Sequence, residues 1–430
     1  MLRTKQIFDV LNAAKVKQQL LLWSEQFGSV VWLDSNQHDC NHSQYDAILA
    51  VDEFTSIRAN KINAFQKLNK FQRDTKDWIF GYLTYDIKND TELLKSENHD
   101  ELGFDELFFF QPKKLFLLKG NKLEIQYLKF FKQDINKDLG VIQRLNLTNE
   151  TRVNKLTIAS RIKKDTYLKK VGTVLDHIHN GDIYEANFCQ EFFAEKATIN
   201  PLKTYNKLND ISKPPFATFL KDGSNYLLSA SPERYIYKEG EMVTSQPIKG
   251  TAKRSHDAKE DARLISQLEN DDKERSENIM IVDLVRNDLS KTAKKGSVQV
   301  KELCKVYTFK QAHQMISTIQ SKVDKAIPPV EIIKTTFPMG SMTGAPKISA
   351  MKIIEKLEET KRGLYSGCVG YFTPEDNFDF NVIIRSILYN SNNRYVSFSV
   401  GSAITSKSIP LKEYEECMIK AKAMLEVLEN

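Results

Sequence analysis

The feature that most constrains this 430-residue chain is a series of short apolar runs, rich in aromatic and β-branched residues, that recur along it. In the first third they include SVVWLD, YDAILAVD, WIFGYLTYD, LFFFQP and KLFLLKG, and charged stretches typical of helices separate them. Apolar or alternating runs of about four to eight residues, rich in such side chains, predict β-strands. The chain must therefore bury extended sheet faces.

The later part of the chain alternates helical patterns with further strands. We expect helical residues at about 163–180, 257–292 with Asp257 as a cap, 346–360 and 411–429. We expect strands at FATFLKD, YLLSASPERYIYKEG and EMVTSQPIKGT, and at 367–373, 380–389 and 395–400. Asp-Gly and Gly turn signals favour antiparallel pairing. The predicted class is α+β, with a two-layered antiparallel β-sheet core flanked by helices.

The most polar stretch, residues 133–157, predicts a boundary between two parts of the chain. We expect residues 1–150 to form the N-terminal part of a two-sheet body and residues 155–430 to form the catalytic domain. A chain of this length can bury a sizeable core in either arrangement.

Composition excludes several classes of protein. Lys and Arg total 62 against 56 Asp and Glu, and the two signs are interspersed, so we expect no nucleic-acid binding. The N-terminus lacks an uninterrupted apolar stretch and no later run is long enough to span a membrane, so we expect neither a signal peptide nor membrane insertion. Five scattered cysteines without a CxxC pair predict reduced thiols in a cytoplasmic protein, without disulfides or zinc; they are Cys40, Cys189, Cys304, Cys368 and Cys417.

Two strand-like segments carry charged residues that a sheet does not need. In SPERY, Glu233 is either paired with a base such as Arg234, in a structural role, or shifted in pKa for proton transfer. In QPIKGT, Lys249 lies between Ile248 and Gly250. A lysine beside apolar groups can lose its proton near neutral pH and act as a nucleophile, although most lysines at strand ends are solvated.

Two helical segments carry carboxylates. Glu277 lies in KERSENIMIVDLVRNDLS, and Glu413 and Glu416 share one face of KEYEECMIKAKAM with Lys420 one turn beyond. Carboxylates from separate helices can hold Mg²⁺, which takes one or two protein carboxylates and keeps water or substrate oxygens. The alternative is local salt bridging, as from Glu416 to Lys420.

Other segments predict contacts with anions. The loop FPMGSMTGAPK, which contains Thr343, opens onto a helix whose free N–H groups suit a negative charge. Arg385 in VIIRSI can grip a carboxylate through two hydrogen bonds, and Gly401 lies in a small-residue turn, VGSAI. Together these segments suggest a site that binds a small anionic substrate and a metal ion and that contains one lysine, Lys249, with a possible chemical role.

These segments, in this order, resemble the chorismate-utilising enzymes. The resemblance covers residue 155 to the end, and less clearly GYLTYD at 81–86. Its specificity comes from an ordered set of motifs: SPERY, PIKGT, ENIMIVDLVRNDLS, GSMTGAPK, RGLYSG, VIIRSI and EYEECMIKAKA.

The resemblance implies roles for individual residues. Glu277 and Glu416, with Glu413 through water, would bind Mg²⁺, which would hold the ring carboxylate of chorismate. Glu233 would be the general acid that helps the ring hydroxyl leave. The second carboxylate and the ring would be bound by Gly250, Thr251, Tyr365, Arg385, Gly401 and Lys420.

The residue at position 249 separates branches of this family. Enzymes that form anthranilate resemble this segment but carry alanine there, and enzymes that hydrate chorismate carry a lysine at the position of Glu185. Lys249 therefore implies the branch that aminates chorismate at C4, where this lysine is thought to attack C2. The alternatives are the anthranilate-forming branch and a non-catalytic relative that binds a ligand or partner.

Three positions depart from the family pattern, and one of them is Ala403, which stands where a second or third glycine is common. Glu185 stands where relatives usually carry glutamine, and could bind ammonium or pair with a neighbouring cation. Gln314 stands where many carry histidine, with His313 one position earlier. The chain shows no glutaminase motif. The resemblance therefore implies that ammonia comes from a separate glutamine amidotransferase subunit in a heterodimer.

Overall fold

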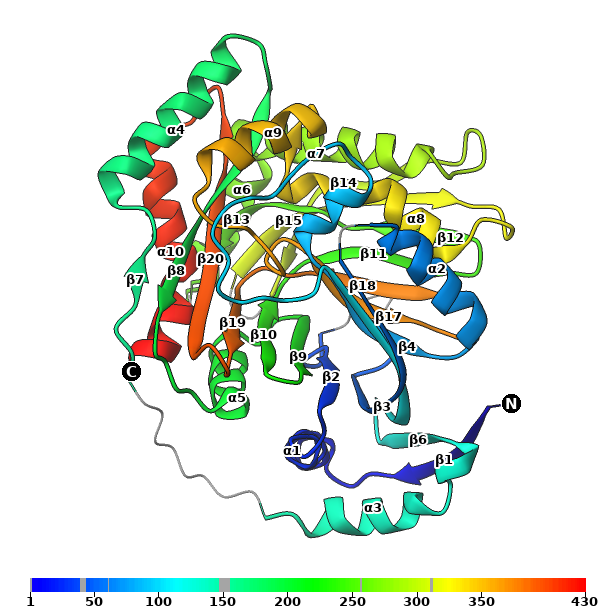
Figure 1. Ribbon diagram of the computed structural model, residues 1–430. Helices are drawn as coiled ribbons and strands as arrows, with labels where there is room; N and C mark the ends of the chain where they lie inside the picture. Colours follow the sequence, from blue (N-terminus) through cyan, green and yellow to red (C-terminus); the bar gives the residue numbers. More distant parts are fainter. Residues whose placement is uncertain (1, 39–43, 61, 147–154, 256, 310–311) are drawn as a thin grey trace.

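The computed structural model, drawn in Figure 1, describes residues 2–38, 44–60, 62–146, 155–255, 257–309 and 312–430. Its named strands join into one large sheet in which every pairing is antiparallel. The sheet divides into two branches at β3 (Ala47–Ala59) and β5 (Leu107–Lys119), the two longest strands. One half of β5 pairs with β6 (Lys122–Leu128), and the other half pairs with β4 (Ile79–Leu83).

The first branch contains the two strands that later contribute Glu185 and Gly401. Beyond β6 it ends at β1 (Arg3–Asp9). Beyond β3 it continues, in order of pairing, through β2 (Ser29–Asp34), β9 (Phe216–Asp222), β10 (Asn225–Ser231), β19 (Ser386–Asn390), β20 (Tyr395–Thr405) and β8 (Glu185–Ala194). The outer edge of β8 pairs with two short strands, β7 (Ala159–Ser160) and β16 (Gly344–Ala345).

The second branch contains the strand that carries Lys249. From β4 it continues through β17 (Cys368–Phe372), β18 (Phe378–Val382), β11 (Arg234–Glu239), β12 (Met242–Ser245) and β15 (Ala312–Lys322). Both β13 (Ile248–Lys253) and β14 (Gln299–Thr308) also pair with β15.

Ten α-helices lie in the described ranges: α1 (Ala13–Ser24), α2 (Ala64–Thr75), α3 (Asp134–Arg144), α4 (Lys164–His179), α5 (Pro201–Ser212), α6 (Ala258–Glu269), α7 (Asp272–Ser290), α8 (Pro329–Thr336), α9 (Lys347–Leu357) and α10 (Pro410–Glu429). Three short 3₁₀ helices accompany them: η1 (Tyr85–Asp90), η2 (Lys129–Phe131) and η3 (Gly340–Met342). In the part of the chain that the structure describes, none of the helices has the length and apolar character needed to cross a lipid bilayer.

Two hydrophobic cores lie on opposite faces of the first branch. Successive side chains of a strand point to opposite faces, so in β3 Ile48 and Ala50 enter one core while Leu49 and Val51 enter the other. The first core packs this branch against the second branch and helices α2, α7 and α8. The second core packs it against α1, α4, α5 and α10, and Figure 1 shows α4 and α10 beside β8 and β20. The predicted α+β class with a two-layered antiparallel core is confirmed.

Strands from before residue 150 are built into the same sheet as later strands. β2 pairs with β9, and β4 pairs with β17. Residues 147–150 lie outside the described residues, and the division into 1–150 and 155–430 stays a prediction. Cys40 also lies outside them, whereas the other four cysteines are buried free thiols.

Two elements that the sequence predicts as continuous are each divided in the structure. The helical region 257–292 is two helices, because Asp271 caps α7 by accepting hydrogen bonds from the backbone N–H groups of Lys273 and Glu274. The predicted strand 380–389 is β18 and β19, separated at Arg385, whose φ of +52° cannot continue a strand.

Candidate active site

Lys249 and Glu185 form a largely buried ion pair where β13 approaches the first residue of β8. Lys249 Nζ donates a hydrogen bond of 3.0 Å to Glu185 Oε1, and Glu185 is 1% exposed. The pairing of β13 with β15 shifts register between Ile248 and Thr251, and Gly250 between them has a φ of +95°. The glycine therefore permits the local backbone irregularity beside Lys249.

The charge state of Lys249 is set by its neighbours in the folded site. Burial lowers the pKa of Lys249, but the carboxylates of Glu185, Glu277 and Glu416 outweigh burial and raise the pKa above its usual value. Lys249 is therefore a cation in this state of the site. Its apolar neighbours in the sequence therefore do not decide its charge, because three carboxylates from different elements converge on it.

Glu233 lies between β10 and β11 and is almost completely buried. Burial raises the pKa of Glu233 to about 7, against the opposing effects of Ser341, Lys249 and the backbone of Ile248. Its Oε1 accepts a hydrogen bond of 2.8 Å from Ser341 Oγ. Arg234, the structural partner considered for it, instead forms an ion pair of 3.0 Å with Asp379. A carboxyl with this pKa can donate a proton at neutral pH.

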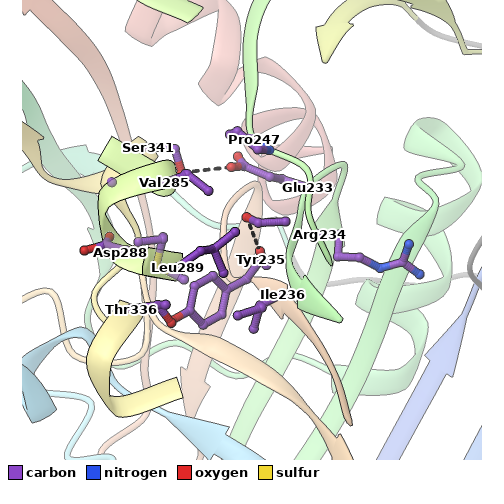
Figure 2. Close-up of a pocket in the computed structure, with 13 residues that line it drawn as sticks. Glu233, Arg234, Tyr235, Ile236, Pro247, Val285, Asp288, Leu289, Thr336 and Ser341 are labelled. Atoms are coloured by element: carbon purple, nitrogen blue, oxygen red, sulfur yellow. Dashed lines mark hydrogen bonds between the residues drawn. The ribbon is translucent and has the colours of Figure 1, made fainter. Parts of the chain in front are cut away.

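Figure 2 shows the cavity that Glu233 borders, with Glu233 and Ser341 turned toward one another and the Arg234 side chain directed away. Apolar side chains such as Val285 and Leu289 form much of its wall. Asp288 is also part of the lining, and its carboxylate accepts hydrogen bonds from Lys291 at 2.9 Å and Lys347 at 2.5 Å. The proton-donating face of Glu233 is thus kept away from bulk water.

Glu277 on α7 and Glu413 on α10 face one another across a lysine that sequence reasoning missed. Lys273 Nζ lies 3.7 Å from Glu277 Oε1 and 3.6 Å from Glu413 Oε1. Burial raises the pKa of Glu277 to about 7, although Lys249 and Lys273 oppose the shift. The only sequence signal for Lys273 is its position four residues before Glu277, on the same helix face.

Glu416 forms a salt bridge with Lys420 one turn further along α10, which was the alternative to a role in metal binding. Lys420 Nζ lies 2.6 Å from Glu416 Oε1 and also donates a hydrogen bond of 2.9 Å to the backbone oxygen of Gly401. Burial would raise the pKa of Glu416, but Lys420 and more distant lysines lower it below its usual value. Across the described ranges, no three His, Cys, Asp or Glu side chains lie close enough to form a complete metal cage.

Several buried polar atoms around these residues have no hydrogen-bond partner within the described chain. They are Glu185 Oε2, Glu277 Oε1, Glu413 Oε2 and Gln314 Oε1. Buried polar atoms in native proteins are nearly always paired, so a concentration of unpaired ones indicates a site for water, an ion or a ligand. The His313 ring, by contrast, has a hydrogen-bond partner at each nitrogen: Thr308 Oγ1 at Nδ1 and Asp261 Oδ1 at Nε2, both at 2.9 Å.

Arg385 and Tyr365 supply the groups predicted to bind a carboxylate. Among the described residues, the Arg385 guanidinium has no ion-pair or hydrogen-bond partner, and burial lowers its pKa against the effects of Tyr365 and Glu416. The Tyr365 hydroxyl lies 3.7 Å from Cys189 Sγ. A partly buried guanidinium of this kind is a strong hydrogen-bond donor site for a ligand carboxylate.

The remaining predicted contact residues differ in what they can offer. Gly401 is required by packing, because a Cβ there would lie 2.4 Å from Cys189 Sγ. Thr343 is fully buried, and its hydroxyl donates to the backbone oxygen of Met339 at 3.2 Å. The side chain of Thr251 is exposed on β13, beside Gly250. Their contacts with a substrate stay predictions.

Comparison with known proteins places this geometry in a family. The family model described as chorismate binding enzyme matches residues 22–426. An Escherichia coli protein named aminodeoxychorismate synthase component 1 is 36% identical over 63% of this chain, which spans 59% of that protein. A Streptomyces griseus protein named aminodeoxychorismate synthase is 40% identical over 63% of this chain, which spans only 37% of it.

A second kind of relative and a solved structure extend the comparison. An anthranilate synthase component I-like protein from Synechocystis is 31% identical over 82% of this chain and 73% of its own length. The crystal structure of anthranilate synthase component I from Streptococcus pneumoniae superposes with a TM-score of 0.78 at 26% identity, covering 90% of this chain and 94% of that one. The chain belongs to the chorismate-binding enzyme family.

Proposed function

We propose that this protein aminates chorismate at C4 in a Mg²⁺-dependent reaction, giving 4-amino-4-deoxychorismate, the precursor of 4-aminobenzoate in folate synthesis. The observation that carries the proposal is Lys249, a buried amine in the same site as a carboxyl, Glu233, whose pKa is about 7. A nucleophile and a proton donor held together suit displacement of a hydroxyl group.

The first step would join Lys249 to the ring. The neutral Nζ attacks C2, the two ring double bonds shift toward C4, and the C4–O bond breaks. Glu233 gives its proton to the departing oxygen, which leaves as water, and becomes a carboxylate. The adduct nitrogen carries one positive charge.

The second step would return Lys249. Ammonia attacks C4, the double bonds shift back, and the C2–N bond breaks, so that the lysine leaves as a neutral amine. The new amino group at C4 is positively charged and holds one proton more than the neutral product. That proton balances the one that Glu233 lost, so chorismate and ammonia give the amine and water.

The metal site would be formed by Glu277 and Glu416, with Glu413 through water. Glu277 Oε1 and Glu413 Oε2 are buried without a hydrogen-bond partner in the described chain, so they keep acceptor capacity that a cation could use. Oxygen ligands of this kind are those that Mg²⁺ prefers. When bound, Mg²⁺ would neutralise the negative charge of the ring carboxylate. For a metal ion to bind between Glu277 and Glu413, the Lys273 side chain must move away from them.

The second carboxylate of chorismate, on its enolpyruvyl group, would be received by Arg385 and Tyr365, with Lys420 nearby. The support is the partly buried Arg385 guanidinium, which has no hydrogen-bond or ion-pair partner among the described side chains. Gly250 and Thr251 would line the ring pocket beside Lys249, and Thr343 would belong to the loop that closes it.

Ammonia would come from a separate glutamine amidotransferase subunit in a heterodimer. The relatives named as component 1 support this partner, because that name implies a second component. A cytoplasmic location is part of the proposal and agrees with four buried free thiols.

The second candidate is formation of anthranilate, which the relatives named as anthranilate synthase components favour. Product analysis separates the two. Purified protein with chorismate, Mg²⁺ and an ammonium salt should give 4-amino-4-deoxychorismate and no fluorescent anthranilate. Fluorescent anthranilate with release of pyruvate would overturn the proposal. Lys249→Ala should abolish the amination, and full activity of that variant would exclude the nucleophile role.

A further inference from the structure

The contact between Glu185 and Lys249 poses a chemical problem for a lysine nucleophile. Among the described residues, the single ion pair of Lys249 is the one with Glu185, at 3.0 Å. Only an amine without its extra proton has the lone pair needed to attack carbon. The lysine is held as a cation here, so its proton must go to a specific acceptor before the first step.

We propose that Glu185 is the base that takes this proton, so that Lys249 becomes a neutral amine while Glu185 becomes a neutral carboxylic acid. The inference rests on the proposed function, because it concerns the amine that attacks chorismate. It adds a second carboxyl with a role opposite to that of Glu233: Glu185 receives a proton from the nucleophile, and Glu233 donates one to the leaving group.

The geometry supports transfer within the pair. Glu185 Oε1 already accepts a hydrogen bond from Lys249 Nζ, and Oε2 is buried without a partner. The lysine side chain is 13% exposed and the glutamate side chain 1%, so direct release of the proton to water is hindered. In such a setting a neutral acid beside a neutral amine avoids the cost of burying two charges.

Other charged groups around Lys249 do not replace Glu185. Glu277 and Glu274 face it from α7, Glu416 from α10, and Glu233 from the turn between β10 and β11. All act on Lys249 through their charge, without a hydrogen bond to its amine in the described part of the chain. Only Glu185 is placed to receive the proton without a change in side-chain position.

The protons balance over one cycle. The proton moves from Lys249 to Glu185, the neutral amine forms the bond to C2, and the adduct nitrogen becomes positive. When ammonia displaces the adduct, Lys249 leaves as a neutral amine and takes its proton back from Glu185. The pair therefore begins and ends with the same single proton, independent of the proton that passes through Glu233.

The test is the rate of adduct formation as a function of pH. Wild-type protein, Glu185→Gln and Glu185→Asp would be mixed with excess chorismate and Mg²⁺ without ammonia, from about pH 5.5 to 8. The Lys249 peptide would be quantified by mass spectrometry after acid quenching. Circular dichroism and calorimetric titration with chorismate would check folding and binding of each variant.

Transfer within the pair predicts that the wild-type rate is level below about pH 7, because the pair keeps its proton over this range. Glu185→Gln must release the lysine proton to water. Its rate at pH 6 should therefore fall by roughly 10²-fold, and the deficit should shrink as the pH rises. Glu185→Asp keeps a carboxylate and should be slower than wild type with the same level profile.

Two results would overturn the inference. If Glu185 only paired with Lys249, the wild-type rate would rise tenfold per pH unit below pH 7, and Glu185→Gln would be as fast as wild type or faster at pH 6. The wild-type profile alone decides the question if a variant does not fold. Absence of any adduct in the wild-type protein would instead contradict the covalent step of the proposed function.

Discussion

Ser341 Oγ donates a hydrogen bond of 2.8 Å to Glu233 Oε1, and this hydroxyl is the side-chain donor that holds the proposed acid in place. A hydrogen bond to a carboxylate favours its charged form, so Ser341 lowers the pKa of Glu233 while burial raises the pKa to about 7. The two residues lie 108 positions apart in the sequence. Their contact links the acid to the loop before α9.

The first prediction concerns pH. Glu233 must carry its proton to act as an acid, so adduct formation should decline as the pH rises above about 7. Ser341→Ala removes the donor, raises the pKa of Glu233 and should move this decline to higher pH. Glu233→Gln should slow adduct formation by roughly 10²- to 10⁴-fold. A decline that stays at the same pH in Ser341→Ala would exclude Glu233 as its source.

The second prediction concerns stability. Lys249→Met leaves the buried carboxylate of Glu185 without its cation, which should cost about 3 kcal/mol of unfolding free energy at pH 8. The double variant Glu185→Gln with Lys249→Met should recover most of the loss. Urea denaturation measures these free energies. The account would be contradicted if Lys249→Met lowered the unfolding free energy equally in the wild-type protein and in Glu185→Gln.

The third prediction concerns the metal. Because Lys273 lies between Glu277 and Glu413, Lys273→Met should tighten Mg²⁺ binding by about tenfold, equivalent to about 1.4 kcal/mol. Titration calorimetry of the protein with MgCl₂ measures the dissociation constant. Lys294→Met is the matched control, since Lys294 pairs with Glu241 on the surface. Unchanged or weaker Mg²⁺ binding in Lys273→Met would contradict the assignment of Glu277 and Glu413 to the metal site.

The fourth prediction concerns Gly401. In Gly401→Ala the new Cβ would lie 2.4 Å from Cys189 Sγ, so we expect a loss of about 1–3 kcal/mol and a displaced acceptor for Lys420. Adding Cys189→Ala removes the sulfur atom and should restore part of the stability. Asn187 and Phe188 also lie within 2.9 Å of that Cβ, so the rescue should be incomplete. Thermal unfolding of the three proteins tests this, and no rescue at all would show that Cys189 is not the obstacle.

Local elements were predictable where periodicity and turn residues agree. The strand FATFLKD is β9, and the helices expected at about 163–180 and 411–429 are α4 and α10. The division of residues 380–389 was not predictable, because it depends on a positive φ at Arg385 that the apolar pattern VIIRSI does not indicate. Long strands such as β15 and the helix α8 were also missed.

The candidate site was predictable as a set of motifs but not as a set of contacts. Glu233, Lys249 and the three glutamates came from ordered segments of the sequence. The ion pair between Lys249 and Glu185 joins residues 64 positions apart and depends on how β13 meets β8, so sequence left the role of Glu185 open. The charge on Lys249 was not predictable for the same reason, since Glu277 and Glu416 act on it from separate helices.

The most direct test of the central claim is the mass of the protein after incubation with chorismate and Mg²⁺ in the absence of ammonia. If Lys249 is the nucleophile, the mass should increase by that of chorismate less one water, on the peptide that contains Lys249. Addition of an ammonium salt should then remove the added mass and release 4-amino-4-deoxychorismate. An unmodified Lys249, together with full amination by Lys249→Ala, would contradict the account.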